Sequence, residues 1–222
     1  MEQENVDNAW DQPIDHLDEE KTIVKMGMAR IRGYVESIEQ LLAERKCKLE
    51  QNEPKWTAGM TEDEWEEAWG EYGSDIHEID YELAKIQRYA LFVYSYSFFE
   101  RILLDVASTY GFTKNLPPFS PPTRGKSIQE AKKYLIDIGA IDWPESWSTW
   151  KEIDSLRLLR NRIVHHDGSL SKNQDENPKE DFLKQWSTYL SIEGYNFELS
   201  HEFIFRVLDT FENFLNELYT KF

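Results

Sequence analysis

The sequence predicts an all-α protein, a helical bundle with long N-terminal helices and a small β-hairpin near residues 190–199. Two observations lead to this prediction. Apolar residues recur at steps of three and four along most of the chain, which is the spacing of one face of an α-helix. Helix-start signals also precede these stretches, as in TEDE at residues 61–64, where the side chains of Thr61 and Glu64 can satisfy each other's backbone N–H groups.

In chain order, the first amphipathic stretch predicts one long helix over residues 19–50. A second helical region begins at Thr61, with bends expected at Gly70 and Gly73. It continues through the most apolar part of the chain to Gly111, which we expect to cap its C-terminus. This apolar part should lie at the centre of the bundle. Further helices are predicted over residues 127–138, over residues 148–168 and from residue 200 to the C-terminus, and four prolines keep residues 114–126 non-helical.

The length of the chain fits one domain, preceded by an acidic tail of residues 1–18. The first 20 residues carry eight acids and no Lys or Arg, which does not fit a signal peptide. The longest mostly apolar run, residues 90–99, is too short for a membrane span, which takes about 20 residues. Cys47 is the only cysteine, so the chain can form no internal disulfide. Together these features predict a cytoplasmic protein with no membrane contact.

The net charge of −17 argues against a nucleic-acid partner only if it is spread over the whole chain. It is not. Residues 1–20 contribute −8 and residues 51–80 contribute −9, so the remaining residues sum to zero. Residues 111–140 carry five basic and two acidic side chains. The charge distribution therefore leaves nucleic acid open as a partner.

The segment LLRNRIVHHDG, residues 158–168, places two arginines, an asparagine and two histidines at the end of a predicted helix. On this helix Asn161 and His165 share a face, whereas Arg160 and His165 diverge by about 140°. Arg160 and His165 can meet at one phosphate if they reach into a cleft between two helices, or if two copies of the helix meet across a dimer axis. Histidine can transfer a proton near neutral pH, and arginine can hold a phosphate and stabilise developing charge.

Two other interpretations of this segment stay open. Basic residues in the last turn of a helix stabilise it through the helix dipole, and Arg157, Arg160, Arg162 and His165 can do this without any other role. The adjacent His166 and Asp167 could instead be ligands of a metal-dependent phosphohydrolase, although such a site needs further ligands from other helices.

The segment RNRIVH, residues 160–165, resembles the Arg-Asn, three residues, His signature of the HEPN superfamily, small helical bundles of which many are metal-independent RNases. The predicted aromatic helix containing YSYSFFERILLDVA, residues 94–107, resembles the helix that packs beside the signature in that family. The resemblance implies a single helical domain of residues 19–222, with a HEPN core over approximately residues 85–222. Residues 19–84 would be an N-terminal helical extension.

The resemblance further implies an endoribonuclease that cleaves RNA by attack of the 2′-hydroxyl group and uses no metal or other cofactor. Arg160 and His165 would be the catalytic pair, and Asn161 a polar helper. The remaining predicted site residues are the accessory positions Glu100, His166 and Arg162 and the RNA-binding positions Arg124, Lys126 and Arg157.

As to partners, the resemblance implies a homodimer in a toxin or phage-defence setting, with an antitoxin or a defence-system protein as partner. Because the family includes inactive members, the alternative is a catalytically silent helical module that binds RNA or protein.

Overall fold

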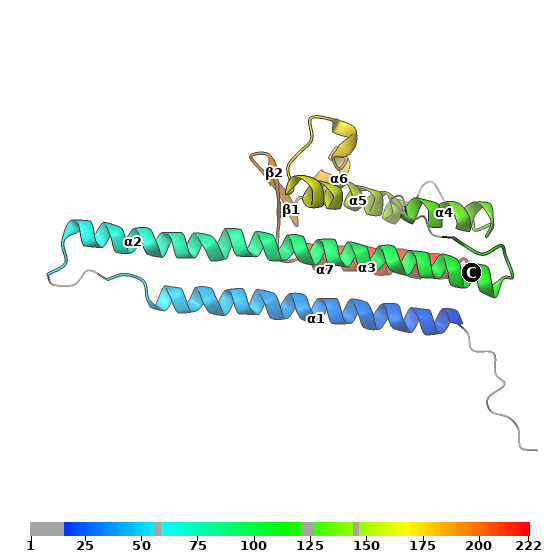
Figure 1. The fold of residues 1–222 in the computed structure, drawn as a ribbon, viewed down its shortest axis with the longest axis horizontal. Helices are drawn as coiled ribbons and strands as arrows, with labels where there is room; N and C mark the ends of the chain where they lie inside the picture. The colour runs from blue at the N-terminus through cyan, green and yellow to red at the C-terminus, as the bar shows by residue number, and fades with distance from the viewer. Residues whose placement is uncertain (1–15, 56–58, 121–126, 144–146) are drawn as a thin grey trace, which may run out of the picture.

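The computed structural model describes residues 16–55, 59–120, 127–143 and 147–222. It is mostly helical with one antiparallel β-hairpin, which confirms the predicted fold class (Figure 1). The elements are α1 (His16–Gln51), α2 (Glu62–His77), the π-helix η1 (Glu78–Leu83), α3 (Ala84–Thr113), α4 (Ser127–Asp137), α5 (Ser148–His166), the 3-10 turn η2 (Gln174–Glu176), α6 (Glu180–Gln185), β1 (Leu190–Glu193), β2 (Asn196–Leu199) and α7 (Phe203–Tyr219).

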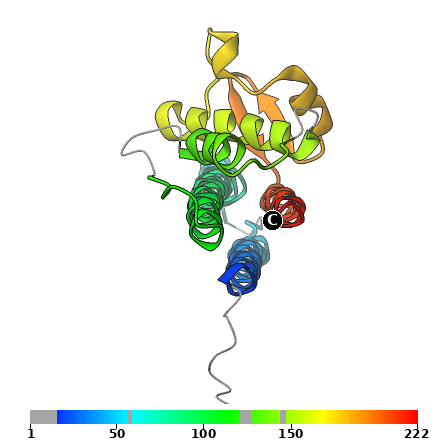
Figure 2. The same ribbon diagram turned by 90° about the vertical axis from the view of Figure 1, so that its right-hand side faces the viewer.

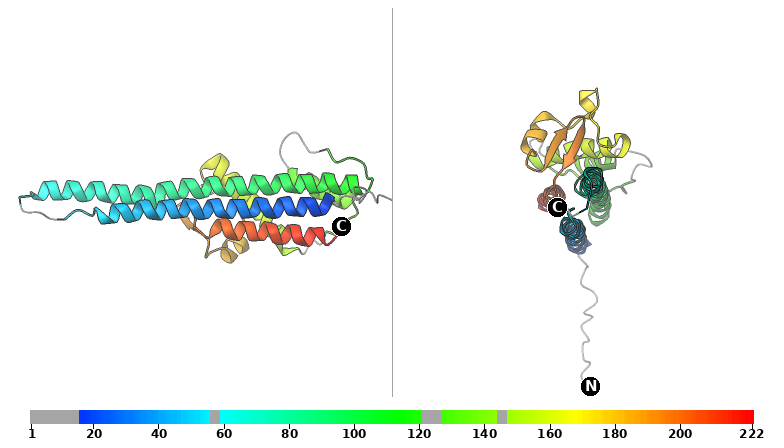
Figure 3. Two further views of the ribbon diagram at one scale, coloured as in Figure 1. Left: turned by 90° about the horizontal axis from the view of Figure 1, so that it is seen from below. Right: turned by 90° about the vertical axis from the view of Figure 1, so that its left-hand side faces the viewer.

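The helix α1 runs antiparallel to the continuous rod formed by α2, η1 and α3, so the first half of the chain is one long helical hairpin (Figures 1 and 3). Ion pairs join its two limbs, among them Arg88 to Glu39 at 2.9 Å and Lys46 to Asp80 at 2.6 Å. Within α2 no residue is buried. The α2 end of the hairpin therefore projects beyond the rest of the bundle, at the left of Figure 1.

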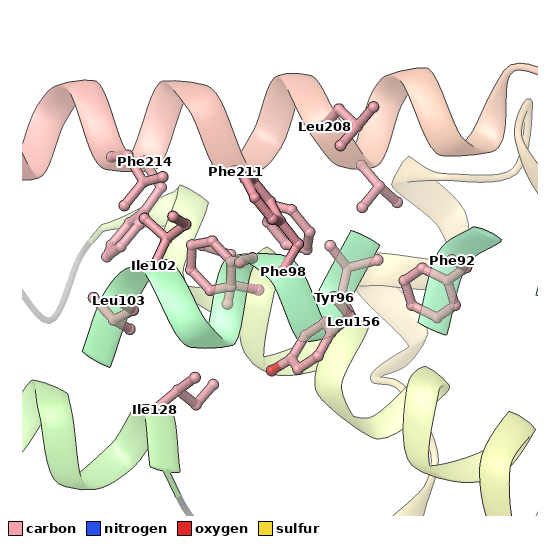
Figure 4. Packing of buried hydrophobic residues seen from close by; sticks show 14 of the residues in the cluster. Phe92, Tyr96, Phe98, Ile102, Leu103, Ile128, Leu156, Leu208, Phe211 and Phe214 are labelled. Atoms are coloured by element: carbon pink, nitrogen blue, oxygen red, sulfur yellow. The ribbon is translucent and has the colours of Figure 1, made fainter. Parts of the chain in front are cut away.

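The helix α3 lies at the centre of the bundle, as its apolar sequence predicts. The helices α1 and α7 pack along it, and α4 and α5 cover its other side (Figure 2). Aromatic rings fill the contact between α3 and α7, where Phe99 stacks on Phe211 with 4.3 Å between ring centroids. Figure 4 shows the neighbouring buried side chains, including Phe92, Tyr96 and Phe214. Buried aromatic side chains contribute strongly to core stability, so this contact fixes the position of α3.

The first half of α1 belongs to the same core as the predicted 85–222 unit. Its residues Val24, Met28, Ile31 and Val35 are buried at steps of three and four, and they join one continuous hydrophobic cluster with α3 and α7. The segment 19–84 is therefore packed into the bundle over its first part and extends away from it only toward the hairpin tip.

The ends of the long helices agree with the sequence at α2 and differ at α3. Thr61 and Glu64 form the predicted capping box, and α2 then passes through Gly70 and Gly73 without interruption. The departure from α-helical geometry comes later, in η1. The predicted cap at Gly111 is wrong, because α3 continues to Thr113. Gly111 is needed for close packing instead, since a Cβ there would lie 2.1 Å from the hydroxyl oxygen of Tyr134.

The end of α5 is held by the loop and hairpin that follow it. Asp167 caps the helix in the left-handed conformation (φ 49°), and Gly168 continues the turn with φ 77°. The predicted hairpin forms with Leu190 opposite Leu199 and with Gly194 in its turn, where φ is 60°. Among the described residues, no helix combines the length and the apolar character needed to cross a membrane.

Candidate active site

The RNRIVH segment lies in the last two turns of α5. One side of this helix is anchored in the core through Ile153, Leu156, Leu159 and Ile163. This packing leaves Arg160, Asn161 and His165 on the sides of the helix that face away from the core. Arg160 Nη1 donates a hydrogen bond of 3.0 Å to Asn161 Oδ1, so two of the three signature side chains are already joined.

The three signature side chains line one cavity of about 830 Å³. Its walls come from three consecutive helices, α3, α4 and α5, and their arrangement creates it. We call this cavity the cleft. Its lining residues are Tyr96 and Glu100 from α3, Ser127, Gln129, Glu130 and Lys133 from α4, and Arg157, Arg160, Asn161 and His165 from α5.

Arg160 and His165 diverge around α5, yet their side chains line the same cleft. Two ways of bringing them together are open from the sequence, a cleft between helices or a dimer axis. In the structure a single chain brings them together in a cleft between helices, because both side chains line the same cavity. The geometry of α5 therefore does not by itself require a second copy.

Glu100 lies on α3, which packs against α5, and it lines the cleft. The hydroxyl of Ser127, the first residue of α4, donates a hydrogen bond to Glu100 Oε1. This bond joins α4 to α3 at the cleft and occupies one acceptor of the carboxylate. Glu100 thus helps to hold the wall of the cleft as well as contributing a negative charge to it.

Several polar atoms of the cleft have no hydrogen-bond partner among the described residues. They are the buried hydroxyl oxygen of Tyr96, Oε1 of Gln129 and Nε of Arg160. Arg157, by contrast, is engaged, since its Nε donates to Asp154 Oδ1 over 2.9 Å. Polar groups buried in a folded protein are normally hydrogen-bonded, so unpaired ones mark a place where a ligand can contribute the missing bond.

Two of the predicted accessory residues are not brought to the cleft. Arg162 is 5% exposed; its Nε donates to the carbonyl of Ser169 over 2.6 Å, and its Nη1 lies 3.4 Å from Glu176 Oε2. It therefore ties the loop after α5 to the helix. His166 is exposed and does not line the cleft; its ring centroid is 6.4 Å from that of His165. The reason in both cases is the helical repeat: the four cleft-lining residues of α5 lie within an arc of about 140° around the helix, and positions 162 and 166 lie outside that arc.

Two RNA-binding predictions, Arg124 and Lys126, lie outside the described residues. The third, Arg157, lines the cleft. The residues that sequence reasoning missed are Tyr96, Ser127, Gln129, Glu130 and Lys133. For Lys133 a signal was present, because it belongs to the net positive stretch 111–140. Tyr96 gave no signal, since it is one of several aromatic residues on an apolar helix.

The pair His166 and Asp167 is placed differently from a metal site. Asp167 caps α5 and lies beside an apolar groove formed with Ile86, Tyr94 and Val164. Within the described part of the chain, no group of three or more His, Cys, Asp or Glu side chains is arranged to hold a metal ion.

No protein-family model matches the chain, and comparisons with curated proteins and with solved structures give no significant match. The residues and geometry of the cleft are therefore the basis for assigning a function.

Proposed function

We propose that this protein is a metal-independent endoribonuclease of the HEPN type and that the cleft is its active site. The observation that carries the proposal is the convergence of Arg160, Asn161 and His165 with Glu100 in one cavity. All four are among the predicted site residues, and Glu100 on α3 is sixty residues before Arg160 on α5. Basic residues of the same cavity, Lys133 and Arg157, add to its attraction for a phosphate backbone.

In the proposed reaction the 2′-oxygen of the ribose attacks the adjacent phosphorus. The new oxygen–phosphorus bond forms as the bond to the 5′-oxygen breaks, so the products are a 2′,3′-cyclic phosphate and a 5′-hydroxyl. One proton leaves the 2′-hydroxyl and one arrives at the 5′-oxygen, and His165 carries one of these transfers. Arg160 balances the negative charge that develops on the phosphoryl oxygens. Asn161 supports Arg160 through their hydrogen bond.

The wider setting of this proposal rests on family resemblance alone. In this setting the protein is a cytoplasmic toxin or phage-defence RNase that works as a homodimer and is controlled by an antitoxin or another defence-system protein. The alternative is a catalytically silent module that uses the same cleft to bind RNA or a protein.

An RNase assay in excess chelator tests the proposal. We expect the wild-type protein to cleave RNA under these conditions and to leave 2′,3′-cyclic phosphate ends. Arg160→Ala and His165→Ala should each reduce cleavage at least about a hundredfold, because each removes a group that acts on the reacting phosphate. Circular dichroism of the same preparations should report an unchanged helical content, since both side chains face the cleft.

His166→Ala is the matched control, because it removes the neighbouring imidazole outside the cleft and should leave cleavage intact. Binding of RNA without cleavage would favour the silent module. Cleavage that appears only after metal is added back would favour a metal-dependent phosphohydrolase. Full activity in both Arg160→Ala and His165→Ala would remove the catalytic assignment.

A further inference from the structure

Tyr96 stands out among the buried tyrosines of the described chain. It is 2% exposed, and its hydroxyl finds no hydrogen-bond partner among the described residues. Three other tyrosines of the same core donate to backbone carbonyls, Tyr89 to Phe197, Tyr110 to Gly139 and Tyr134 to Pro117. A buried hydroxyl without a partner destabilises a fold, so its retention calls for another explanation.

The hydroxyl of Tyr96 is directed toward the cleft. Figure 4 shows the Tyr96 oxygen pointing away from α7, on the side where Ile128 of α4 and Leu156 of α5 lie. Tyr96 is one of the cleft-lining residues, one helical turn before Glu100 on α3. Tyr96 therefore lines the same cavity as the three residues assigned to the reaction, although its ring belongs to the aromatic core through contacts with Phe99 and Phe211.

The electrostatic surroundings keep this hydroxyl protonated and leave it free to donate. Burial raises the pKa of Tyr96 far above its ordinary value, and the Glu100 carboxylate raises it further, whereas the nearby guanidinium groups of Arg157 and Arg160 act in the opposite direction. The phenol is therefore neutral at physiological pH. Arg160 contributes a second unpaired donor, its Nε, to the same cavity. Two unpaired donors on residues that line one cavity suit an oxyanion, since hydrogen bonds to ionised acceptors are the strong ones.

We propose that the Tyr96 hydroxyl is a direct ligand of the RNA in the cleft, donating a hydrogen bond to a non-bridging oxygen of the phosphoryl group that Arg160 also contacts. This inference rests on the proposed ribonuclease function and extends it by a residue outside the RNRIVH segment. Tyr96 binds the phosphoryl group from the floor of the cleft, while Arg160 and His165 reach it from α5.

Tyr96→Phe tests this assignment, because it removes one oxygen and keeps the ring in the core. The probe is a short single-stranded RNA with every 2′-hydroxyl methylated, so that it binds without being cut. We expect affinity to fall about tenfold, which is about 1.4 kcal/mol. The melting temperature of the protein without RNA should rise by roughly 2–4 °C, because an unpaired buried hydroxyl is lost.

The matched control is Tyr110→Phe, on the same helix and also buried, whose hydroxyl donates to the Gly139 carbonyl over 3.1 Å. It should lose stability and keep its affinity for the RNA. A hidden partner for Tyr96 within the fold, such as Gln129 Oε1, would make Tyr96→Phe less stable than the wild type and would overturn the inference. Unchanged affinity for the methylated RNA in Tyr96→Phe would overturn it as well.

A second probe separates failure of the inference from failure of the proposed function. Inorganic phosphate, compared with sodium chloride at the same ionic strength, should raise the melting temperature of the wild type and not that of Tyr96→Phe. If phosphate behaves in this way while the RNA does not bind, Tyr96 is still a phosphoryl ligand and RNA is the wrong substrate class. If neither probe binds the wild type, both proposals fail.

Discussion

Arg160 and Arg162 are two residues apart on α5, yet their surroundings assign them opposite roles. A helix turns by about 100° per residue, so positions two apart point in very different directions. Arg160 reaches the cleft with an unpaired Nε, whereas Arg162 is buried and bonded to the carbonyl of Ser169. The same type of side chain thus lines the cleft at one position and attaches a loop at the other.

This difference predicts opposite results for two matched substitutions. Arg162→Met should lower the free energy of unfolding by about 2 kcal/mol, because it removes a charged donor and leaves the Ser169 carbonyl unsatisfied. Arg160→Met should change it by less than about 0.5 kcal/mol. RNA cleavage should be lost in Arg160→Met and kept in folded Arg162→Met. Urea unfolding and an RNase assay on the same samples measure both effects, and equal loss of stability in the two variants would contradict the assignment.

At the scale of a single element, the start of α1 buries the acidic side chain of Glu20, where a negative charge is unfavourable. Glu20 is 8% exposed and lies against α3 and α7. Burial, followed by the negative charge of Asp105, raises the pKa of Glu20 from 4.5 to about 7, and the Thr109 hydroxyl opposes this rise. Burial and the Glu20 charge also raise the pKa of Tyr219, while the Lys21 ammonium lies 5.5 Å from the Tyr219 ring centroid. The packing of α1 against α3 and α7 is therefore linked to the protonation of Glu20.

The sign of this linkage follows from the raised pKa. Between about pH 4.5 and 7 the Glu20 carboxyl keeps its proton in the folded state and loses it in the unfolded state. Its contribution to the stability of the fold is therefore complete below about pH 4.5 and is lost as the pH rises through about 7. Glu20→Gln keeps the shape without the charge. It should raise the free energy of unfolding at pH 8 by about 1–2 kcal/mol, a range that allows for solvent screening, and should have little effect at pH 4.5.

Urea unfolding at the two pH values measures this effect. Glu36→Gln, an exposed acid on the same helix, should show no such pH-dependent gain. A gain for Glu20→Gln of the same size at both pH values would show that the carboxylate does not titrate in this range.

At the scale of the whole molecule, a groove with exposed apolar side chains lies next to the cleft. Ile86 and Tyr94 of α3 are 60% and 61% exposed, and Val164 of α5 is 46% exposed. They line one groove of about 580 Å³, and Val164 immediately precedes His165. Contiguous exposed apolar surface of this kind is typical of protein interfaces. Because the cleft is formed within one chain, this surface is the structural feature that now supports the proposed homodimer.

We therefore expect light scattering to report about twice the chain mass of 26.4 kDa. Tyr94→Glu should convert the protein to monomers, because it places a charge in the apolar groove. Tyr195→Glu, in the hairpin turn where the side chain is 80% exposed, is the control and should leave the mass unchanged. A wild-type protein that is monomeric at all concentrations and fully active would contradict the dimer.

The sequence by itself determined the helical class, the long first helix, the capping box at Thr61 and the hairpin near residue 194, because these depend on local spacing and turn chemistry. It did not determine the end of α3, since Gly111 serves a contact with Tyr134 and not a cap. Local signals cannot reveal a contact between residues that are distant along the chain.

The candidate site, too, was only partly predictable from the sequence. The RNRIVH spacing and the aromatic helix pointed to Arg160, Asn161, His165 and Glu100, and the tertiary structure brings these four to one cavity. Only the packing of α4 and α5 on α3 decided that Tyr96 and Lys133 join them. Only the path of the loop after α5 decided that Arg162 is structural. Residue type and helical spacing set which side chains can share a face, but the direction in which each face points is fixed by what the helix packs against.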